Sequence, residues 1–259
     1  MTQEKLPALS THNLSVSIGD VCLVKNLTLN LQAGERLVIL GRNGAGKTSL
    51  LHTLAGLRAA ASGNVQWNGA DSSAIDPRQA AQQRGLLPQH HTDAFQSTVL
   101  ETALIGRHPH LGRWSWESAA DERIARDALQ EVGLSELAER DIQTLSGGER
   151  QRLAIATLLA QDPRVYLLDE PLAHLDLNHQ IAMLKLMSAR AKAGAAVVMV
   201  HHDVNLALRY SDRALLLFGD GSYCEGPVEE VMEVDALSRL YGYPLRVIRD
   251  GSESYVVPE

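Results

Sequence analysis

The residues best suited to chemistry lie in a glycine-rich stretch near the start of the chain. Gly41, Gly44 and Gly46 are followed directly by Lys47 and Thr48. Glycine lets the backbone fold closely round an anion with its N–H groups turned inward, and a helix that begins there directs its positive dipole end at the same point. In such loops the lysine reaches the β- and γ-phosphates, and the hydroxyl ligates Mg²⁺. The spacing therefore predicts a phosphate loop that binds a nucleoside triphosphate.

The segments on either side of this loop predict the strand and the helix that hold it. Residues 37–40 form a short apolar run typical of a buried strand, and residues 48–57 have a helical pattern that ends at Gly56. A glycine-rich turn can match the spacing by chance, but the strand before it and the helix after it favour the phosphate loop. We expect the nucleotide to be contacted by Gly41, Arg42, Asn43, Gly44, Ala45, Gly46, Lys47, Thr48 and Ser49.

Strands and helices alternate along the chain, which predicts an α/β fold class. Residues 9–32 alternate loosely between apolar and polar around a central turn, so we expect a small antiparallel sheet that residues 65–67 join. Short apolar runs at 85–88, 164–168 and 195–200 are typical of buried strands, and helical segments separate them. This order predicts a parallel sheet with helices on both faces.

Helical periodicity dominates residues 98–161. The pattern is interrupted at residues 106–112 and again at 141–148, and the stretch is rich in Ala, Leu, Glu and Arg. We therefore expect a separate helical lobe here. Beyond the last parallel strand, the pattern predicts a hairpin over residues 214–225, one helix over 228–241 and a strand-like tail.

Composition narrows the classes of protein to which the chain can belong. Its 259 residues are 45% hydrophobic and 21% charged, as in ordinary globular proteins. A formal net charge of −7 argues against bulk nucleic-acid binding. The longest apolar runs fall short of the roughly 18 residues needed to span a bilayer, and the N-terminus lacks the form of a signal peptide. Cys22 and Cys224 stand outside any Cys-x-x-Cys unit, so we expect reduced thiols in the cytoplasm.

A second motif, Ser146-Gly147-Gly148, opens a helix-like segment farther along the chain. The two glycines expose their N–H groups beside a hydroxyl at the positive end of a helix. As an isolated tripeptide it would more often be an ordinary N-cap. Together with the phosphate loop and the apolar run that ends at Asp169 and Glu170, the motif resembles the signature of ATP-binding-cassette ATPases.

The resemblance covers essentially the whole chain and implies a fold. Members of this family have a phosphate-loop NTPase core of the RecA-like type, built on a parallel sheet. An N-terminal antiparallel β subdomain and an inserted α-helical subdomain complete the single ATPase domain. The resemblance assigns residues 1–89 and 162–259 to the nucleotide-binding core and residues 90–161 to the helical subdomain.

The same resemblance implies roles for four further residues beside Thr48. Asp169 would ligate Mg²⁺ together with Thr48, and Glu170 would polarise the attacking water as a general base. Gln89 matches the glutamine that senses Mg²⁺ and water, and His202 matches the switch histidine at the γ-phosphate. ATP and Mg²⁺ are therefore the implied cofactors.

A homodimer is implied as well, because one chain carries one complete set of motifs. In this family two domains pack head to tail, and the signature of one closes on the ATP held by the other. Asp176 matches the loop across this interface, although the preceding Ala173 and His174 depart from the usual small polar residues. His201, beside the switch histidine, is expected to have no catalytic role.

The segment Gly106-Arg107-His108-Pro109-His110 indicates a branch of the family. It is similar to a segment of ATPases that serve importers of iron–siderophore complexes, haem and cobalamin. The implied partners are two integral-membrane permease subunits and, indirectly, a periplasmic substrate-binding protein. The implied location is the cytoplasmic face of the inner membrane.

Two alternatives to this importer are a soluble cassette ATPase acting on ribosomes or DNA and half of an exporter. The first kind usually carries two cassettes or long inserted coiled coils, and the second often has fused membrane spans. The sequence shows none of these features.

Several side chains allow more than one interpretation. Ile18 takes the position at which the family usually stacks an aromatic residue on adenine; alternatively, Ile18 faces the core of the small sheet and His12 meets the base. Trp114 and Trp116 could contact a membrane partner, but anchoring the core of the helical lobe is the favoured interpretation. We also expect residues 106–113, with Gln89, to border a groove for the membrane subunit, so that Arg107 and His108 serve coupling.

The histidine pairs are the remaining candidates for a metal site. Neither His90 with His91 nor His108 with His110 has a third ligand at a convincing helical spacing. We therefore expect neither pair to bind a metal ion.

Overall fold

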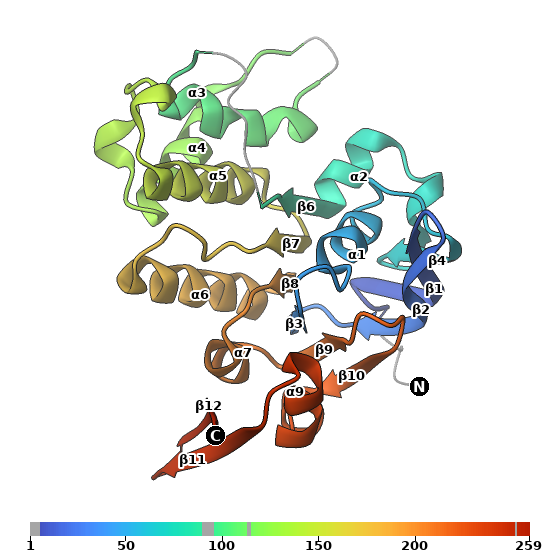
Figure 1. Cartoon of the computed structure of the whole chain (residues 1–259). Helices are drawn as coiled ribbons and strands as arrows, with labels where there is room; N and C mark the ends of the chain where they lie inside the picture. Colours follow the sequence, from blue (N-terminus) through green and yellow to red (C-terminus); the bar gives the residue numbers. More distant parts are fainter. Residues whose placement is uncertain (1–5, 90–95, 113–114, 252) are drawn as a thin grey trace, which may run out of the picture.

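A six-stranded sheet forms the centre of the computed structural model, which describes residues 6–89, 96–112, 115–251 and 253–259. Strands β9, β3, β8, β7 and β6 are parallel, and β10 is antiparallel to β9 at one edge. Helices cover both faces of this sheet (Figure 1). The strands are β3 (Arg36–Gly41), β6 (Arg84–Leu87), β7 (Val165–Asp169), β8 (Ala196–Val200), β9 (Arg213–Leu217) and β10 (Tyr223–Pro227).

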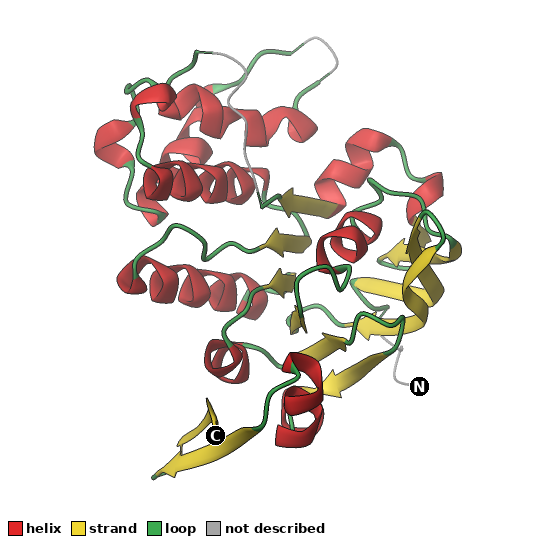
Figure 2. Cartoon of the chain, viewed as in Figure 1, coloured by secondary structure: helices red, strands yellow, loops and turns green. Residues whose placement is uncertain are grey.

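An antiparallel sheet lies beside the central one, as the alternating N-terminal pattern predicts (Figure 2). Helix α1 (Lys47–Leu54) packs between the two sheets, and its leucines share one buried apolar cluster with both of them. The sheet contains β1 (Leu9–Ile18), β2 (Val21–Leu31), β4 (Ser62–Trp67) and β5 (Ala70–Asp71). The chain returns to the central sheet through the short η1 (Ser72–Ala74) and α2 (Pro77–Gln83).

The predicted helical stretch packs against the other face of the central sheet. Its buried side chains form one continuous cluster with those of α6 (Leu177–Lys192) and of strands β7 and β8. Three of its helices begin after a serine or threonine, at Thr98, Ser118 and Ser146. Each hydroxyl accepts a hydrogen bond from a backbone N–H of the first turn, and an acidic side chain there accepts one in return from the N–H of the serine or threonine. The elements are α3 (Val99–Leu104), η2 (Ile105–His110), α4 (Ala119–Glu131), η3 (Ser135–Leu137), η4 (Ile142–Thr144) and α5 (Gly147–Gln161).

The C-terminal elements cover one end of the sheet and differ from the expectation at one point. The predicted single helix over 228–241 is wrong, because α8 (Val228–Val231) ends at Met232 and α9 (Val234–Tyr241) starts anew. Met232 is buried against the sheet, and the two short helices share one apolar cluster with it. The remaining elements are α7 (Val204–Tyr210), β11 (Leu245–Asp250) and β12 (Glu253–Pro258).

The expected interruption at residues 106–112 also differs from the structure. A 3-10 helix, η2, continues through Gly106 to His110. A Cβ atom on Gly106 would collide with the carbonyl oxygen of Thr157 on α5. The glycine is therefore needed for close helix packing and does not break the helix. Among the described residues, no helix combines the length and apolar character that crossing a bilayer requires.

Candidate active site

The phosphate loop has the conformation that its glycines predict. Gly44 and Gly46 have φ angles of 81° and 95°, in the left-handed region that glycine adopts at least cost. A Cβ atom on Gly46 would lie only 2.7 Å from the Cβ of Leu23. The loop joins the end of β3 to the start of α1, so free N–H groups and the positive end of a helix point out of the sheet edge.

Lys47 is held inside this loop. Its side chain is buried, and Nζ donates hydrogen bonds to the carbonyl oxygens of Gly41 at 2.9 Å and Arg42 at 3.1 Å. Burial lowers the pKa of Lys47, while the carboxylates of Glu170 and Asp169 act in the opposite direction. The ammonium group therefore lies where a phosphate would relieve the cost of burying it.

A cavity of about 440 Å³ opens over the loop and collects most of the predicted residues. This volume lies within the range of small-molecule sites, roughly 300–1,000 Å³. The sequence did not single out Leu23; its apolar strand pattern indicated only the core of the small sheet. The lining residues are Ile18, Leu23, Asn43, Gly44, Gly46, Lys47, Thr48, Ser49, Gln89, Glu170 and His202.

Asp169 ends β7 beneath this cavity and is fully buried. Neither of its carboxylate oxygens has a hydrogen-bond partner in the described part of the chain. Burial raises the pKa of Asp169, and the neighbouring Glu170 charge adds to the effect, whereas Thr48 opposes it. A buried carboxylate with free oxygens, next to a hydroxyl, is the donor set that a hard divalent cation prefers. These residues therefore fit Mg²⁺.

Glu170 and His202 face each other at the rim of the cavity. Nε2 of His202 lies 2.9 Å from Oε1 of Glu170, within hydrogen-bond distance. Both side chains line the cavity, although they come from the ends of different strands. A carboxylate in this position can accept a proton from a water molecule that attacks a phosphate held by the loop.

Ile18 lies at the edge of the cavity, and His12 does not line it. The Ile18 side chain is 50% exposed, so it is not part of the core of the small sheet. The structure therefore contradicts the alternative in which Ile18 is buried and His12 meets the base.

The signature residues and Asp176 lie outside this cavity. Ser146 accepts a hydrogen bond from the N–H of Glu149 at 3.3 Å and caps α5, while the Glu149 carboxylate accepts one from the N–H of Ser146 at 2.7 Å. Asp176 caps α6 in a similar way through the N–H of His179. Gly147 is exposed and Gly148 is partly so, so their N–H groups are not enclosed by this chain.

Two expectations about the segment after Gln89 are wrong. Arg107 is only 9% exposed: its guanidinium donates to Asp121 at 3.0 Å and to the carbonyl oxygen of Ala160 at 2.7 Å. It therefore joins η2 to α4 and α5 and is not available to a partner. Trp116 is 89% exposed and does not anchor a core.

The histidine pairs have ordinary contacts where they can be described. Nε2 of His108 lies 3.5 Å from a Glu117 oxygen, and Nε2 of His110 lies 2.8 Å from the carbonyl oxygen of Gln161. Within the described ranges, no group of three or more potential ligand residues is arranged to hold a metal ion. Trp114 and the pair His90–His91 lie outside the described residues.

Comparison with known proteins agrees with this geometry. Residues 24–173 match the family model described as "ABC transporter". The hemin import ATP-binding protein HmuV of Deinococcus radiodurans is 40% identical over 247 residues, which covers 93% of this chain and 92% of that protein. The ferric enterobactin transport ATP-binding protein FepC of Escherichia coli is 35% identical over 251 residues, with coverage of 95% and 92%.

A solved structure is similar over nearly the whole chain. It is described as an inward-facing conformation of an ABC transporter of the metal-chelate type, and it superimposes with a TM-score of 0.84 at 28% identity. The superposition covers 97% of each chain. The family match, the sequence relatives and the phosphate-loop site agree, and this chain belongs to the ABC transporter family as an ATP-binding, ATP-hydrolysing subunit.

Proposed function

We propose that this chain is the ATP-hydrolysing subunit of an importer for an iron chelate or a related metal chelate, such as an iron–siderophore complex, haem or cobalamin. The similar proteins named for hemin import and ferric enterobactin transport support this substrate class. So does the solved transporter of the metal-chelate type. Their names do not favour the alternative of a soluble ATPase that acts on ribosomes or DNA.

Hydrolysis rests on side chains that meet at one cavity. Lys47 and the loop N–H groups would bind the β- and γ-phosphates, and Glu170 would take the proton of the attacking water. His202 would orient Glu170 and contact the γ-phosphate, with Gln89 beside the water. The observation that carries this proposal is the 2.9 Å contact between His202 and Glu170 at the rim of the phosphate-loop cavity.

Mg²⁺ would be held by Asp169, Thr48 and Gln89. The buried oxygens of Asp169, which have no hydrogen-bond partner among the described residues, support this assignment. When bound, the cation supplies positive charge against the phosphates and makes the γ-phosphate a better target for water. The charge on Asp169, which burial disfavours, is then compensated.

A homodimer would complete two composite sites. Ser146, Gly147, Gly148 and Asp176 would act on the nucleotide of the opposite protomer. Their exposure outside the cavity of their own chain supports this arrangement. We also propose the division into a nucleotide-binding core of residues 1–89 and 162–259 and a helical subdomain of residues 90–161, with the helical part bearing the signature.

The membrane partners would be two integral-membrane permease subunits at the cytoplasmic face of the inner membrane. A periplasmic substrate-binding protein would deliver the chelate to the permease from the other side. The support comes from the import names of the relatives.

Reconstitution tests this function directly. The chain should co-purify with a polytopic membrane partner, and proteoliposomes of the complex should take up one of three probes: a ferric siderophore, haem or cobalamin. Uptake should require ATP and should stop in the Glu170→Gln variant. Stimulation of the ATPase by ribosomes or DNA, with no membrane partner and no uptake, would overturn the importer assignment.

A further inference from the structure

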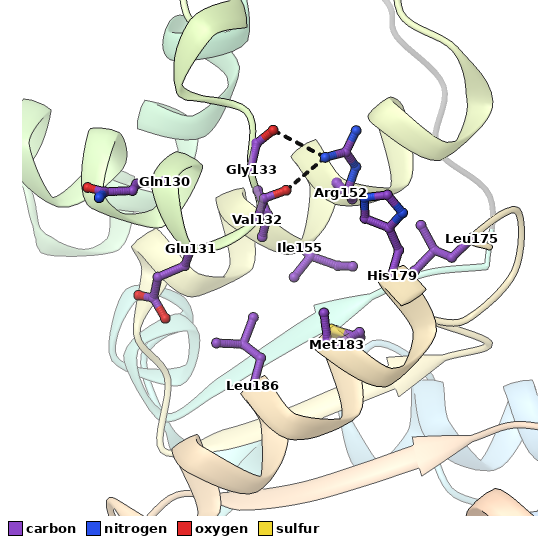
Figure 3. Close-up of a pocket in the computed structure, with 11 residues that line it drawn as sticks. Gln130, Glu131, Val132, Gly133, Arg152, Ile155, Leu175, His179, Met183 and Leu186 are labelled. Carbon is purple, nitrogen blue, oxygen red and sulfur yellow. Dashed lines mark hydrogen bonds between the residues drawn. The ribbon is translucent and has the colours of Figure 1, made fainter. Parts of the chain in front are cut away.

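A second cavity, of about 310 Å³, lies where the helical segment meets α6 (Figure 3). One wall comes from the end of α4, the turn after it and α5, and the other comes from α6 and the residue before Asp176. It shares no lining residue with the phosphate-loop cavity. Its lining residues are Gln130, Glu131, Val132, Gly133, Arg152, Ile155, Leu175, His179, Ala182, Met183 and Leu186.

The interior of this cavity is apolar. Ile155, Met183 and Leu175 are 2%, 3% and 9% exposed, and Leu186 is half-buried beside them. An engineered apolar cavity of about 150 Å³ holds one benzene molecule. By that measure this cavity takes a ligand of roughly 12 non-hydrogen atoms, about the size of a phenyl ring with a three-carbon chain that carries two oxygen atoms.

One end of the cavity carries the positive charge of Arg152, which acts on the Glu149 carboxylate outside the lining. Nη1 of Arg152 donates to the carbonyl oxygens of Val132 at 3.0 Å and Gly133 at 3.2 Å, which are neutral acceptors. Figure 3 shows Arg152 and His179 at this end and Leu186 at the other. Among the described residues these are the hydrogen bonds that the Arg152 guanidinium donates, so its remaining N–H groups can donate to a carboxylate.

The other charged groups of the lining are already paired. The Glu131 carboxylate accepts a hydrogen bond from Arg190 at 2.6 Å. Nδ1 of His179 lies 2.8 Å from the carboxylate of Asp176. Among the described residues, Arg152 is therefore the charged group of the lining without an ion pair inside it. Outside the lining its charge acts on the Glu149 carboxylate, which already accepts a hydrogen bond from the N–H of Ser146. The guanidinium favours an anionic ligand.

We propose that this cavity binds a small amphipathic carboxylate whose aryl or branched aliphatic body packs on Ile155, Met183 and Leu186 while its carboxylate pairs with Arg152. Both walls contact such a ligand, so it joins the helical segment to α6. The site is separate from the phosphate-loop cavity, and Leu175 and His179 place it beside Asp176 of the proposed dimer interface.

The methyl group of Met183 provides a direct probe of this site. The chain has five methionines, so labelled methionine methyl groups give few NMR signals. The signal that disappears in the Met183→Leu variant is that of Met183. Titration of the full chain with 3-phenylpropionate should shift the Met183 signal to saturation, with a Kd near or below about 1 mM. Met232 lies in a different apolar cluster and is the internal control.

Variants separate the two parts of the proposal. Ala182→Phe places a ring at the cavity wall and should abolish the shift, whereas Ala189→Phe, exposed on the same helix outside the lining, should preserve it. Arg152→Met should weaken the binding of 3-phenylpropionate by about tenfold or more but leave the affinity for the neutral 3-phenylpropanol unchanged. An unmoved Met183 signal, or one that moves equally in Ala182→Phe, would overturn the site. Equal binding of acid and alcohol to the unmodified chain would overturn the carboxylate assignment.

Discussion

Nε2 of His202 lies 2.9 Å from Oε1 of Glu170, and the backbone of Glu170 has an unusual, left-handed conformation. Its φ angle is 50°, which costs a residue with a Cβ atom about 1–2 kcal/mol. The N–H of Glu170 donates to the carbonyl oxygen of Val200 at 3.0 Å, so the neighbouring strand holds this geometry. Backbone strain of this kind persists at functional sites, where it fixes the orientation of a side chain. The Glu170 carboxylate lines the phosphate-loop cavity.

His201 makes the fold sensitive to acid. It is 4% exposed, and burial lowers its pKa to about 4. Because the unfolded chain binds this proton with a pKa near 6.5, stability falls as the pH drops from about 6.5 toward 4. Between pH 7 and pH 5 this proton should cost the unmodified chain about 2 kcal/mol of unfolding free energy, and His201→Asn should not show this loss. Urea unfolding at the two pH values measures the difference. The exposed His12→Asn is the matched control, and an unchanged pH dependence in His201→Asn would refute the assignment.

Asp169 should weaken the fold in order to bind a cation. Burial raises the pKa of Asp169 in the folded chain above that in the unfolded chain. The ionised carboxylate therefore lowers the free energy of unfolding, fully at a pH above the folded-state pKa and not at all at a pH below the unfolded-state pKa. Asp169→Asn should therefore raise the free energy of unfolding at neutral pH in the absence of nucleotide. The same change should reduce Mg²⁺-dependent ATP affinity at least about tenfold. Urea unfolding and calorimetry with and without Mg²⁺ measure both effects, with the exposed Asp127→Asn as control; a destabilised variant would count against this account.

Arg107 has a structural role in place of the expected coupling role. Because its guanidinium is buried against Asp121 and the carbonyl oxygen of Ala160, Arg107→Ala should cost about 2 kcal/mol or more of stability. His108 has a side chain that is 58% exposed, so His108→Ala should leave stability nearly unchanged and reduce transport while sparing ATP hydrolysis. Thermal unfolding separates the two. Equal stability of both variants would contradict the structural role of Arg107, and undiminished uptake with His108→Ala would move the docking site elsewhere.

The sequence predicts the parts of the site whose geometry is local. The phosphate loop follows from its glycines, and Asp169 and Glu170 follow from an apolar strand that ends at two carboxylates. Arg107 could not be placed in this way, because its partners are distant in sequence and burial of an arginine leaves no local pattern. The break at Met232 was missed for a similar reason: its apolar side chain continues the helical pattern, and only packing against the sheet shows where the helix ends.

Ile18 should limit the preference of the site for adenine. An aliphatic side chain at the cavity edge covers one face of a base but lacks the ring stacking that contributes about 0.5–1.5 kcal/mol. We expect modest discrimination between ATP and GTP, and up to roughly tenfold tighter ATP binding in Ile18→Tyr. Dissociation constants for both nucleotides check this, with His12→Tyr as the control outside the cavity. Unchanged ATP affinity in a folded Ile18→Tyr protein would show that the base lies elsewhere.

The ATP turnover of Glu170→Gln, measured together with its ATP affinity, tests the central claim most directly. The substitution keeps the size and the neighbours of the side chain but removes its ability to accept a proton. Turnover should fall by roughly 10²-fold or more, while the dissociation constant for ATP stays within about threefold of the unmodified value because the loop and Lys47 are intact. Hydrolysis at close to the unmodified rate would contradict the assignment of Glu170 as the general base.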